Sequence, residues 1–278
     1  MSLGSKIANR RRAVGMTQQE LAEKLDVSPQ AVSSWERDEF LPETAKLKDI
    51  AGCLKTKISW LFEENDAVEI GWELHDAMFS VDNMNRRVQM FIQAKGYSQS
   101  SKAMKIMLKE HEGTFRKSRS GEQIPYIIHP LLMACHAFAL DVASDEVIAA
   151  ILLHDVVEDC PVSIDELDVS DEVKKAVDLV SFKIIDGLSK EESKAVYYRK
   201  IAENPIASIV KIIDRCNNVS TMATGFSSKK IVKYIDETEK YVLPLINTIR
   251  SEYEEYNNAA FLIKYQILSV MESLKRLL

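Results

Sequence analysis

The sequence predicts an all-α protein with two domains. Its 278 residues correspond to about two domains of average length. Glycine and proline are scarce, at 9 and 7 residues, where average usage gives about 19 and 14. Hydrophobic residues make up 46% and charged residues 28%, which is normal for a globular chain and excludes a disordered tail protein. Few turn-forming residues and long charged stretches therefore favour helices throughout.

Three stretches differ in pattern along the chain. Residues 1–65 contain short helical periods broken by turns, which predict a first domain of five helices. Residues 66–98 contain Gly71 and then an amphipathic run from Trp72 to Ile92, which predicts a helical linker. Residues 99–278 hold long helical patterns with few breaks, and we interpret them as the second domain.

Composition and charge indicate in which compartment the protein is expected and which partners are expected. No apolar run approaches the ~18 residues of a membrane span, and the polar, basic start of the chain does not fit a signal peptide. The four cysteines form no CxxC pair, so we expect reduced, buried thiols in a cytoplasmic protein without a membrane partner. Residues 1–65 are neutral and the whole chain carries −6, so charge alone does not indicate nucleic-acid binding.

The first domain contains signals for paired short helices. Thr17 and Glu20 have the spacing of a capping box, which begins a helix. Ser28 and Pro29 supply an N-cap and a first-position proline for the next helix. Two short helices with a connector of about three to four residues make a helix-turn-helix. Apolar stripes within residues 47–62 are expected to close a five-helix core.

This block resembles the Xre/Cro-type helix-turn-helix family through the run GMTQQELAEKLDVSPQAVSSWERDEFLPETAKLKDIA. In that family the second of the paired helices enters the major groove of DNA. The resemblance implies base contacts from Gln30 and Ser34, with Ser33 a weaker candidate. Gln18 and Arg37 would lie near phosphates. It also implies double-stranded DNA as a partner and a homodimer, since one module buries little surface. A protein-interaction module is the alternative, favoured by the neutral charge.

The strongest chemical signal lies in three separate segments of the second domain. They hold two histidines and four carboxylates: His129, His154, Asp155, Glu158, Asp159 and Asp214. Residues 147–157 are almost wholly apolar, which predicts a buried helix. Helical spacing puts Glu158 one turn from His154, and Asp159 one turn from Asp155. Buried carboxylates must be paired, hydrogen-bonded or bound to metal, because an unpaired buried charge is strongly destabilising.

Two histidines and two aspartates from three segments make a ligand set of nitrogen and oxygen atoms. Such a set suits Mn²⁺, Fe²⁺ or Zn²⁺ and has too much nitrogen for Ca²⁺. The metal would lower the pKa of a bound water towards neutrality and hold a phosphoryl oxygen. Glu158 and Asp159 then remain to support the ligands or to handle protons. His75 and Asp76 form another His-Asp pair without such surroundings, and we interpret it as a solvated face of the linker.

The second domain is similar to the hydrolase domain of the RelA/SpoT family, a branch of the HD-type metal phosphohydrolases. The runs HEGTFRKSRSGEQIPYIIHP, LLHDVVED, VKIIDRCNNVSTM and ETEKYVLPLI follow the order found in that family. The resemblance implies metal ligands at His129, His154, Asp155 and Asp214, and an acidic pair that acts on the attacking water at Glu158 and Asp159. It implies nucleotide contacts from Arg116 or Arg119, Lys117, Asn218 and Thr221.

The implied reaction is Mn²⁺-dependent hydrolysis of the 3′-pyrophosphate of ppGpp and pppGpp, with another divalent metal as the alternative. Extra residues in RKSRSGEQIPYI leave open whether Arg116 or Arg119 meets the phosphates, and Asn217 stands where the family often has histidine. Because 34 residues follow Pro244, we expect no synthetase domain. Two other functions stay open: a transcriptional regulator whose second domain senses a nucleotide, and a different HD-type nucleotidase.

Overall fold

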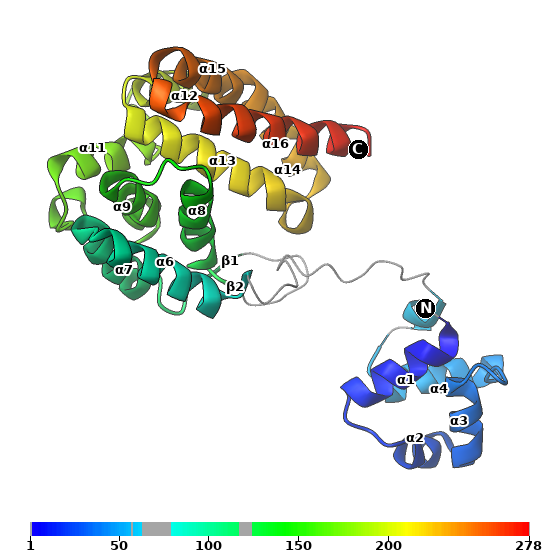
Figure 1. The fold of residues 1–278 in the computed structure, drawn as a ribbon. Helices are drawn as coiled ribbons and strands as arrows, with labels where there is room; N and C mark the ends of the chain where they lie inside the picture. Colours follow the sequence, from blue (N-terminus) through cyan, green and yellow to red (C-terminus); the bar gives the residue numbers. More distant parts are fainter. Residues whose placement is uncertain (1, 57, 63–78, 117–123, 278) are drawn as a thin grey trace. The chain divides into compact units, whose positions relative to one another are not determined.

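The computed structural model describes residues 2–56, 58–62, 79–116 and 124–277. Most of the described residues are helical and few are in strands (Figure 1), which confirms the predicted all-α class. It divides into two compact units, Met1–Glu69 and Ile70–Leu278, each with its own hydrophobic core. No helix in the described part of the chain is long and apolar enough to cross a membrane.

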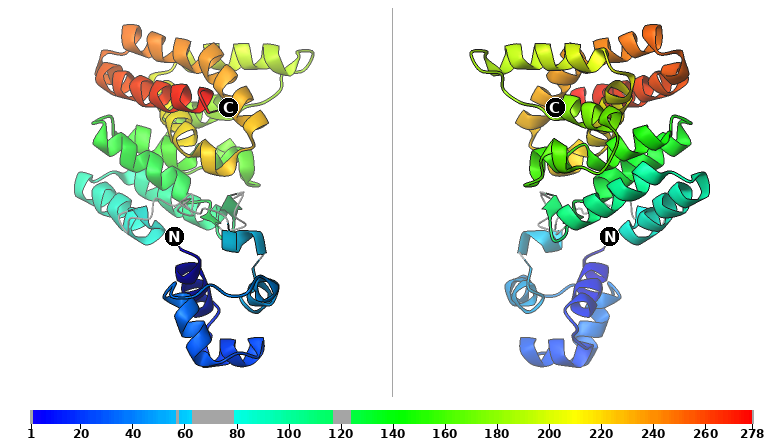
Figure 2. Two further views of the ribbon diagram at one scale, coloured as in Figure 1. Left: turned by 90° about the vertical axis from the view of Figure 1, so that its right-hand side faces the viewer. Right: turned by 90° about the vertical axis from the view of Figure 1, so that its left-hand side faces the viewer.

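The first unit has the five-helix organisation that the sequence predicts. Its described residues form α1 (Leu3–Ala13), α2 (Gln18–Leu25), α3 (Pro29–Glu36), α4 (Leu47–Cys53) and α5 (Ile58–Phe62). The predicted capping box joins Thr17 and Glu20 at the start of α2. Ser28 caps α3, with Pro29 in its first turn. These helices, blue to light blue in Figure 2, enclose one small core, and α2 and α3 form the predicted helix-turn-helix.

The second unit is a bundle built around one long helix. Its helices are α6 (Val81–Lys95), α7 (Ser98–Glu110), α8 (Ile128–Ala139), α9 (Asp145–Leu153), α10 (Val156–Asp159), α11 (Asp171–Val180), α12 (Lys190–Ala202), α13 (Pro205–Gly225), α14 (Ser228–Glu237), α15 (Leu243–Glu252) and α16 (Asn257–Lys275). Helix α13, yellow in Figure 1, contacts α8 and α9 on one side and α15 and α16 on the other. Side chains on α13 can therefore meet residues from distant segments.

Two short strands interrupt the helical pattern before α8. β1 (Phe115–Arg116) pairs antiparallel with β2 (Ile124–Pro125). Arg116 faces Ile124 in the ladder, and this pairing fixes the backbone at Arg116. Two of the predicted nucleotide contacts, Lys117 and Arg119, lie outside the described residues.

The predicted linker over residues 66–98 contains α6, which is part of the second unit. Its Met84, Val88 and Ile92 are buried and belong to the core that α8 and α9 also supply. The helix packs on α8 and α7, because its apolar face is more stable against a core than in water. Gly71, Trp72, His75 and Asp76 lie outside the described residues.

The buried helix predicted over residues 147–157 is interrupted, and the expectation of one continuous helix is wrong. Helix α9 ends at Leu153, and α10 begins at Val156. The imidazole of His154 donates from Nδ1 to the carbonyl of Ile151 over 2.8 Å, the carbonyl that the Asp155 N–H takes in a continuous helix. The break lies at the two proposed ligands, His154 and Asp155, while the bond from the Asp159 N–H to the Asp155 carbonyl keeps one helical turn between those two residues.

The cysteines agree only in part with the expectation of buried thiols. All four are free, but Cys216 alone among them is buried, while Cys53, Cys135 and Cys160 are half-buried. Burial raises the pKa of the Cys216 thiol to about 12, so it stays protonated at neutral pH.

Candidate metal centre and its cavity

Side chains from three segments of the second unit converge on one buried place. His129 comes from α8, and His154 and Asp155 come from the break between α9 and α10; one ligand atom of each lies within 4.8 Å of the others. Asp214 comes from α13, and its Oδ1 lies 3.3 Å from Nε2 of His129. The structure therefore brings all four predicted metal ligands together.

Hydrogen bonds at Nδ1 orient both imidazoles. His129 donates from Nδ1 to Oδ1 of Asn217 over 2.7 Å, and His154 donates to the Ile151 carbonyl. A neutral imidazole carries one proton, so each bond leaves a lone pair on Nε2, facing the carboxylates. Nε2 of His154 is buried 2.9 Å from Oδ2 of Asp155 without hydrogen-bond geometry. Two such nitrogens beside two carboxylates fit a divalent cation.

Crowded charges set the protonation states of the cluster. Burial disfavours the charged form of His154, but the neighbouring Asp155 outweighs burial and raises the pKa of His154 to about 9. Burial acts to raise the pKa of Asp155, yet the imidazole of His154 lowers it overall. The pKa of Asp214 is also lowered despite burial, because Nζ of Lys211 lies 3.0 Å from its Oδ2. Both carboxylates are thus ionised at neutral pH, as metal ligands must be, whereas His154 must release the proton on Nε2 before that nitrogen can bind a metal.

Tyr126 and Asn217 belong to the site but are not among the residues predicted from the sequence. The hydroxyl of Tyr126 donates to Asp155, and its ring stacks on His111 with centroids 4.5 Å apart. Burial, reinforced by the charge of Asp155, raises the pKa of Tyr126 far above its usual value, so the phenol remains a donor. Their spacing, three residues from His129 and from Asp214, is the signal that could have found them.

The cluster opens into a cavity of about 330 Å³ with a charged lining. The described lining residues include the cations Arg116, Lys190, Lys194, Lys211 and Arg215 and the carboxylates Asp155, Glu158, Asp214 and Glu237. Arg116 donates to Oδ1 of Asn218 over 3.0 Å, while its Nη1 is buried without a hydrogen-bond partner in the described part of the chain. An unused guanidinium donor at the cavity favours an anionic ligand.

The acidic pair splits between two environments. Glu158 lines the cavity and accepts a hydrogen bond from the N–H of Phe182 over 3.2 Å. Burial raises the pKa of Glu158, and the charge of Asp155 adds to the rise, although the bond from Phe182 opposes it. Both side chains are partly open to solvent, but Asp159 is not among the described residues that line the cavity. Glu158 is therefore the better placed of the two to exchange a proton with a ligand.

The predicted nucleotide contacts on α13 also differ from each other. Asn218 lines the cavity and donates to Oδ1 of Asp214 over 2.5 Å. Thr221 is not among the described lining residues, and its hydroxyl donates to the backbone carbonyl of Asn217 over 3.1 Å. Asn218 thus joins the metal cluster to Arg116, whereas Thr221 lies further along the helix.

Three of the five predicted DNA contacts are hydrogen-bonded within the first unit. Gln18 donates to Glu36 over 2.7 Å. Arg37 donates to the hydroxyl of Ser33 over 2.6 Å and pairs with Glu39. A phosphate would have to replace these partners of Gln18 and Arg37. The other two residues predicted to contact bases lie one turn apart on α3, with Gln30 exposed and Ser34 half-buried.

Fold and site together define a helix-turn-helix domain followed by a helical domain with a His/Asp cluster able to hold a divalent cation. Residues 7–61 match the family model described as Helix-turn-helix. The chain is 33% identical over 162 residues to the guanosine-3′,5′-bis(diphosphate) 3′-pyrophosphohydrolase of Aquifex aeolicus (strain VF5), covering 51% of this chain and 22% of that protein. It is 27% identical over 207 residues to the bifunctional (p)ppGpp synthase/hydrolase SpoT of Escherichia coli (strain K12), covering 69% of this chain and 28% of that protein.

These comparisons confirm the resemblance to the helix-turn-helix and RelA/SpoT proteins that the motifs indicate. The chain spans only 22% and 28% of the length of these two curated relatives. A solved structure described as "A metazoan ortholog of SpoT hydrolyzes ppGpp and plays a role in starvation responses" aligns with 63% of this chain and 95% of its own, at 20% identity and a TM-score of 0.49.

Proposed function

We propose that this chain is a cytoplasmic hydrolase that removes the 3′-pyrophosphate of ppGpp or pppGpp, with Mn²⁺ as its metal. The observation that carries the proposal is the meeting of His129, His154 and Asp155 beside Asp214, at a cavity whose described lining contains both cations and carboxylates. The curated relatives named for the ppGpp reaction support this substrate.

The residues at the site fit a divalent metal, and each has a separate role in the proposed hydrolysis. His129, His154, Asp155 and Asp214 would hold the ion, which when bound supplies Lewis acidity to a water and a phosphoryl oxygen. Arg116 binds phosphate oxygens through its unused donor. Glu158 accepts a proton from the attacking water and gives it to the 3′ oxygen, which leaves as a hydroxyl when its bond to phosphorus breaks. The products are pyrophosphate and GDP or GTP.

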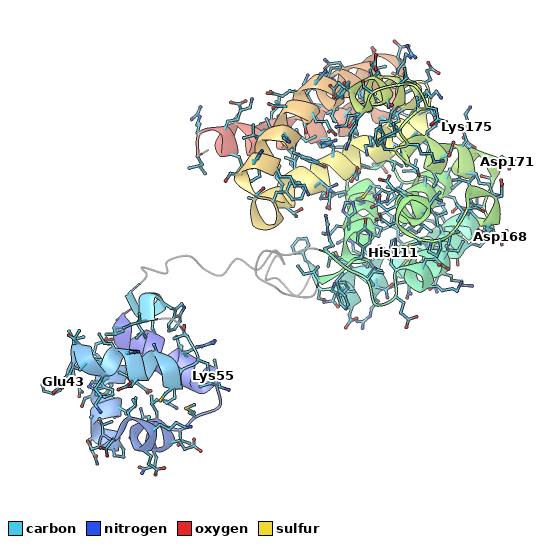
Figure 3. All side chains as sticks on the ribbon, turned by 180° about the vertical axis from the view of Figure 1, so that it is seen from behind. Glu43, Lys55, His111, Asp168, Asp171 and Lys175 are labelled. Carbon is cyan, nitrogen blue, oxygen red and sulfur yellow. The ribbon has the colours of Figure 1, made fainter. Side chains whose placement is uncertain are left out.

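The test follows pyrophosphate release from ppGpp by the purified chain with Mn²⁺. We expect turnover by the wild type, none by Asp155→Ala or Glu158→Ala, and loss on chelation that added Mn²⁺ reverses. Asp171→Ala is the matched control, because Asp171 lies on the surface at the start of α11 (Figure 3). Full rates after exhaustive metal removal contradict the mechanism.

Two other results select other functions. Binding of ppGpp without turnover, equal in the wild type and both site variants, favours a regulator that senses the nucleotide. Turnover of NADPH or another nucleotide but not of ppGpp favours a different HD-type nucleotidase. Both enzyme hypotheses use the same metal cluster, so the nucleotide that is hydrolysed distinguishes between them.

We also propose that the first unit binds double-stranded DNA as a homodimer, with Gln30 reading a base in the major groove. Duplexes selected from random DNA by the full chain supply the probe. Gln30→Ala should reduce discrimination at one base pair by about 1–3 kcal/mol, while Gln19→Ala on α2 should not. Failure to select any sequence favours a protein-interaction module, and unchanged discrimination contradicts the assignment of Gln30.

A further inference from the structure

Asn217 is a buried amide that contacts the back of one proposed metal ligand. It lies on α13 three residues after Asp214, and its Oδ1 accepts the hydrogen bond from Nδ1 of His129 over 2.7 Å. The two residues are almost inaccessible to water, with 3% of Asn217 and 2% of His129 exposed. No solvent molecule can readily take the place of this acceptor.

The other side of the His129 ring meets competing acceptors. Oδ1 of Asp214 lies 3.3 Å from Nε2 of His129, and Oδ2 of Asp155 lies 4.0 Å away. Asp214 favours a proton on Nε2 because its Oδ1 is close enough to accept a hydrogen bond from it, and the negative charge of Asp155 acts in the same direction. An imidazole protonated on Nε2 has no lone pair there and cannot bind a metal through that atom.

We propose that Asn217 is a positioning residue that keeps the proton of His129 on Nδ1 and so leaves Nε2 available as a ligand. The inference rests on the proposed metal centre. For His154 a backbone carbonyl, that of Ile151, accepts the equivalent bond, and no substitution at another residue removes it directly. For His129 the acceptor is a side chain, so tautomer control can be changed by mutation.

The first test is the ¹⁵N NMR spectrum of the histidine-labelled full chain before and after addition of Zn²⁺, a diamagnetic probe. We expect His129 of the wild type to carry its proton on Nδ1 before Zn²⁺ is added, and to bind the ion through Nε2 afterwards. The second test is calorimetric titration with Mn²⁺. Asn217→Leu keeps the volume and removes the acceptor, and should weaken Mn²⁺ binding about 10–100-fold. Asn217→Asp keeps an acceptor oxygen and should bind Mn²⁺ close to the wild-type affinity.

Ser220→Ala is the matched control on α13. The Ser220 hydroxyl donates to the carbonyl of Cys216 and accepts from Gln266, and neither partner is a proposed metal ligand. Equal Mn²⁺ affinity of Asn217→Leu and wild type overturns the proposal. A wild-type His129 protonated on Nε2 also overturns the proposal. Because this spectrum is recorded on the wild type, the proposal can be tested even if Asn217→Leu does not fold. Wild-type chain that binds Mn²⁺ but leaves ppGpp intact refutes only the proposed substrate, whereas failure to bind Mn²⁺ or Zn²⁺ overturns both proposals.

Discussion

The hydroxyl of Tyr126 donates a hydrogen bond to Asp155, and the accepting oxygen, Oδ2, also lies 2.9 Å from Nε2 of His154. One carboxylate oxygen therefore has two polar neighbours. The stack of Tyr126 on His111, at the end of α7 (Figure 3), holds the phenol in place. The direction of a proposed metal ligand thus depends on a residue that does not bind the metal.

Tyr126→Phe keeps the ring and its stack but removes the donor. We expect Mn²⁺ affinity to fall about 10–100-fold, since Asp155 then loses the bond that orients it, and ppGpp turnover at fixed Mn²⁺ to fall with it. Calorimetric titration with Mn²⁺ checks the first effect. Tyr253→Phe is the control, because the Tyr253 hydroxyl bonds the carbonyl of Ala202. Equal affinity of Tyr126→Phe and the wild type would show that Asp155 needs no such support.

Arg116→Ala should weaken nucleotide binding and leave metal binding intact. Its Nη1 has no hydrogen-bond partner among the described residues, although Arg116 lines the cavity, and a charge-assisted hydrogen bond contributes about 1.5–3 kcal/mol. We therefore expect the KM for ppGpp to rise about 10–100-fold, with unchanged affinity for Mn²⁺. Steady-state kinetics measure the rise, with Arg86→Ala on the exposed side of α6 as control. A KM equal to that of the wild type would exclude Arg116 as a phosphate contact.

Arg215 lines the cavity but is committed to the fold. Its Nη2 donates to Glu237 over 2.6 Å and to the Tyr198 hydroxyl over 2.8 Å, and its guanidinium lies 4.0 Å from the ring centre of Tyr234. Only 3% of its side chain is exposed. Arg215→Ala leaves Glu237 without this partner, and we expect the free energy of unfolding to fall by about 3–5 kcal/mol.

Urea denaturation followed by circular dichroism measures this fall in the free energy of unfolding of Arg215→Ala. Lys102→Ala is the control in the same unit, since its pair with Asp168 (Figure 3) is exposed on both sides and contributes at most about 1 kcal/mol. Similar losses in the two variants would mean that the buried pair contributes no more than a surface pair.

Glu36 makes the first unit sensitive to acid. Burial acts to raise the pKa of Glu36, but hydrogen bonds from Arg11 and Gln18 outweigh it and lower the pKa below its usual value. The stability from these bonds is present above the unfolded pKa of about 4.3 and is lost as pH falls through the folded value. Glu36→Gln should therefore show a smaller loss of stability between neutral pH and pH 3 than the wild type.

Tryptophan fluorescence during urea unfolding measures this difference. All three tryptophans lie within the first 72 residues, and Trp35 is buried in the first core. Parallel loss of stability in Glu36→Gln and the wild type would contradict a role for Glu36 in the acid response.

Local patterns in the sequence were sufficient for the helices, their caps and the identity of the metal-ligand candidates. The capping box of Thr17 and Glu20 and the Ser28-Pro29 start involve neighbours within one turn. The histidines and aspartates stood out because ionisable groups are rare inside apolar runs. The same local reasoning failed at His154, where a side chain takes a backbone acceptor and ends the helix.

Only the tertiary structure decided which side chains meet. His129 and Asn217 are 88 residues apart, and Arg116 and Asn218 are 102 apart, so no local period relates them. Packing of α13 against α8 brings His129 to Asn217, whereas Arg116 reaches Asn218 from strand β1. Packing of α6 assigns that helix to the second core. Helical periodicity and capping act over a few residues, whereas contacts between distant segments depend on how buried faces fit. The sequence alone therefore determined most of the helices and the candidate ligands, and the fold determined which side chains meet.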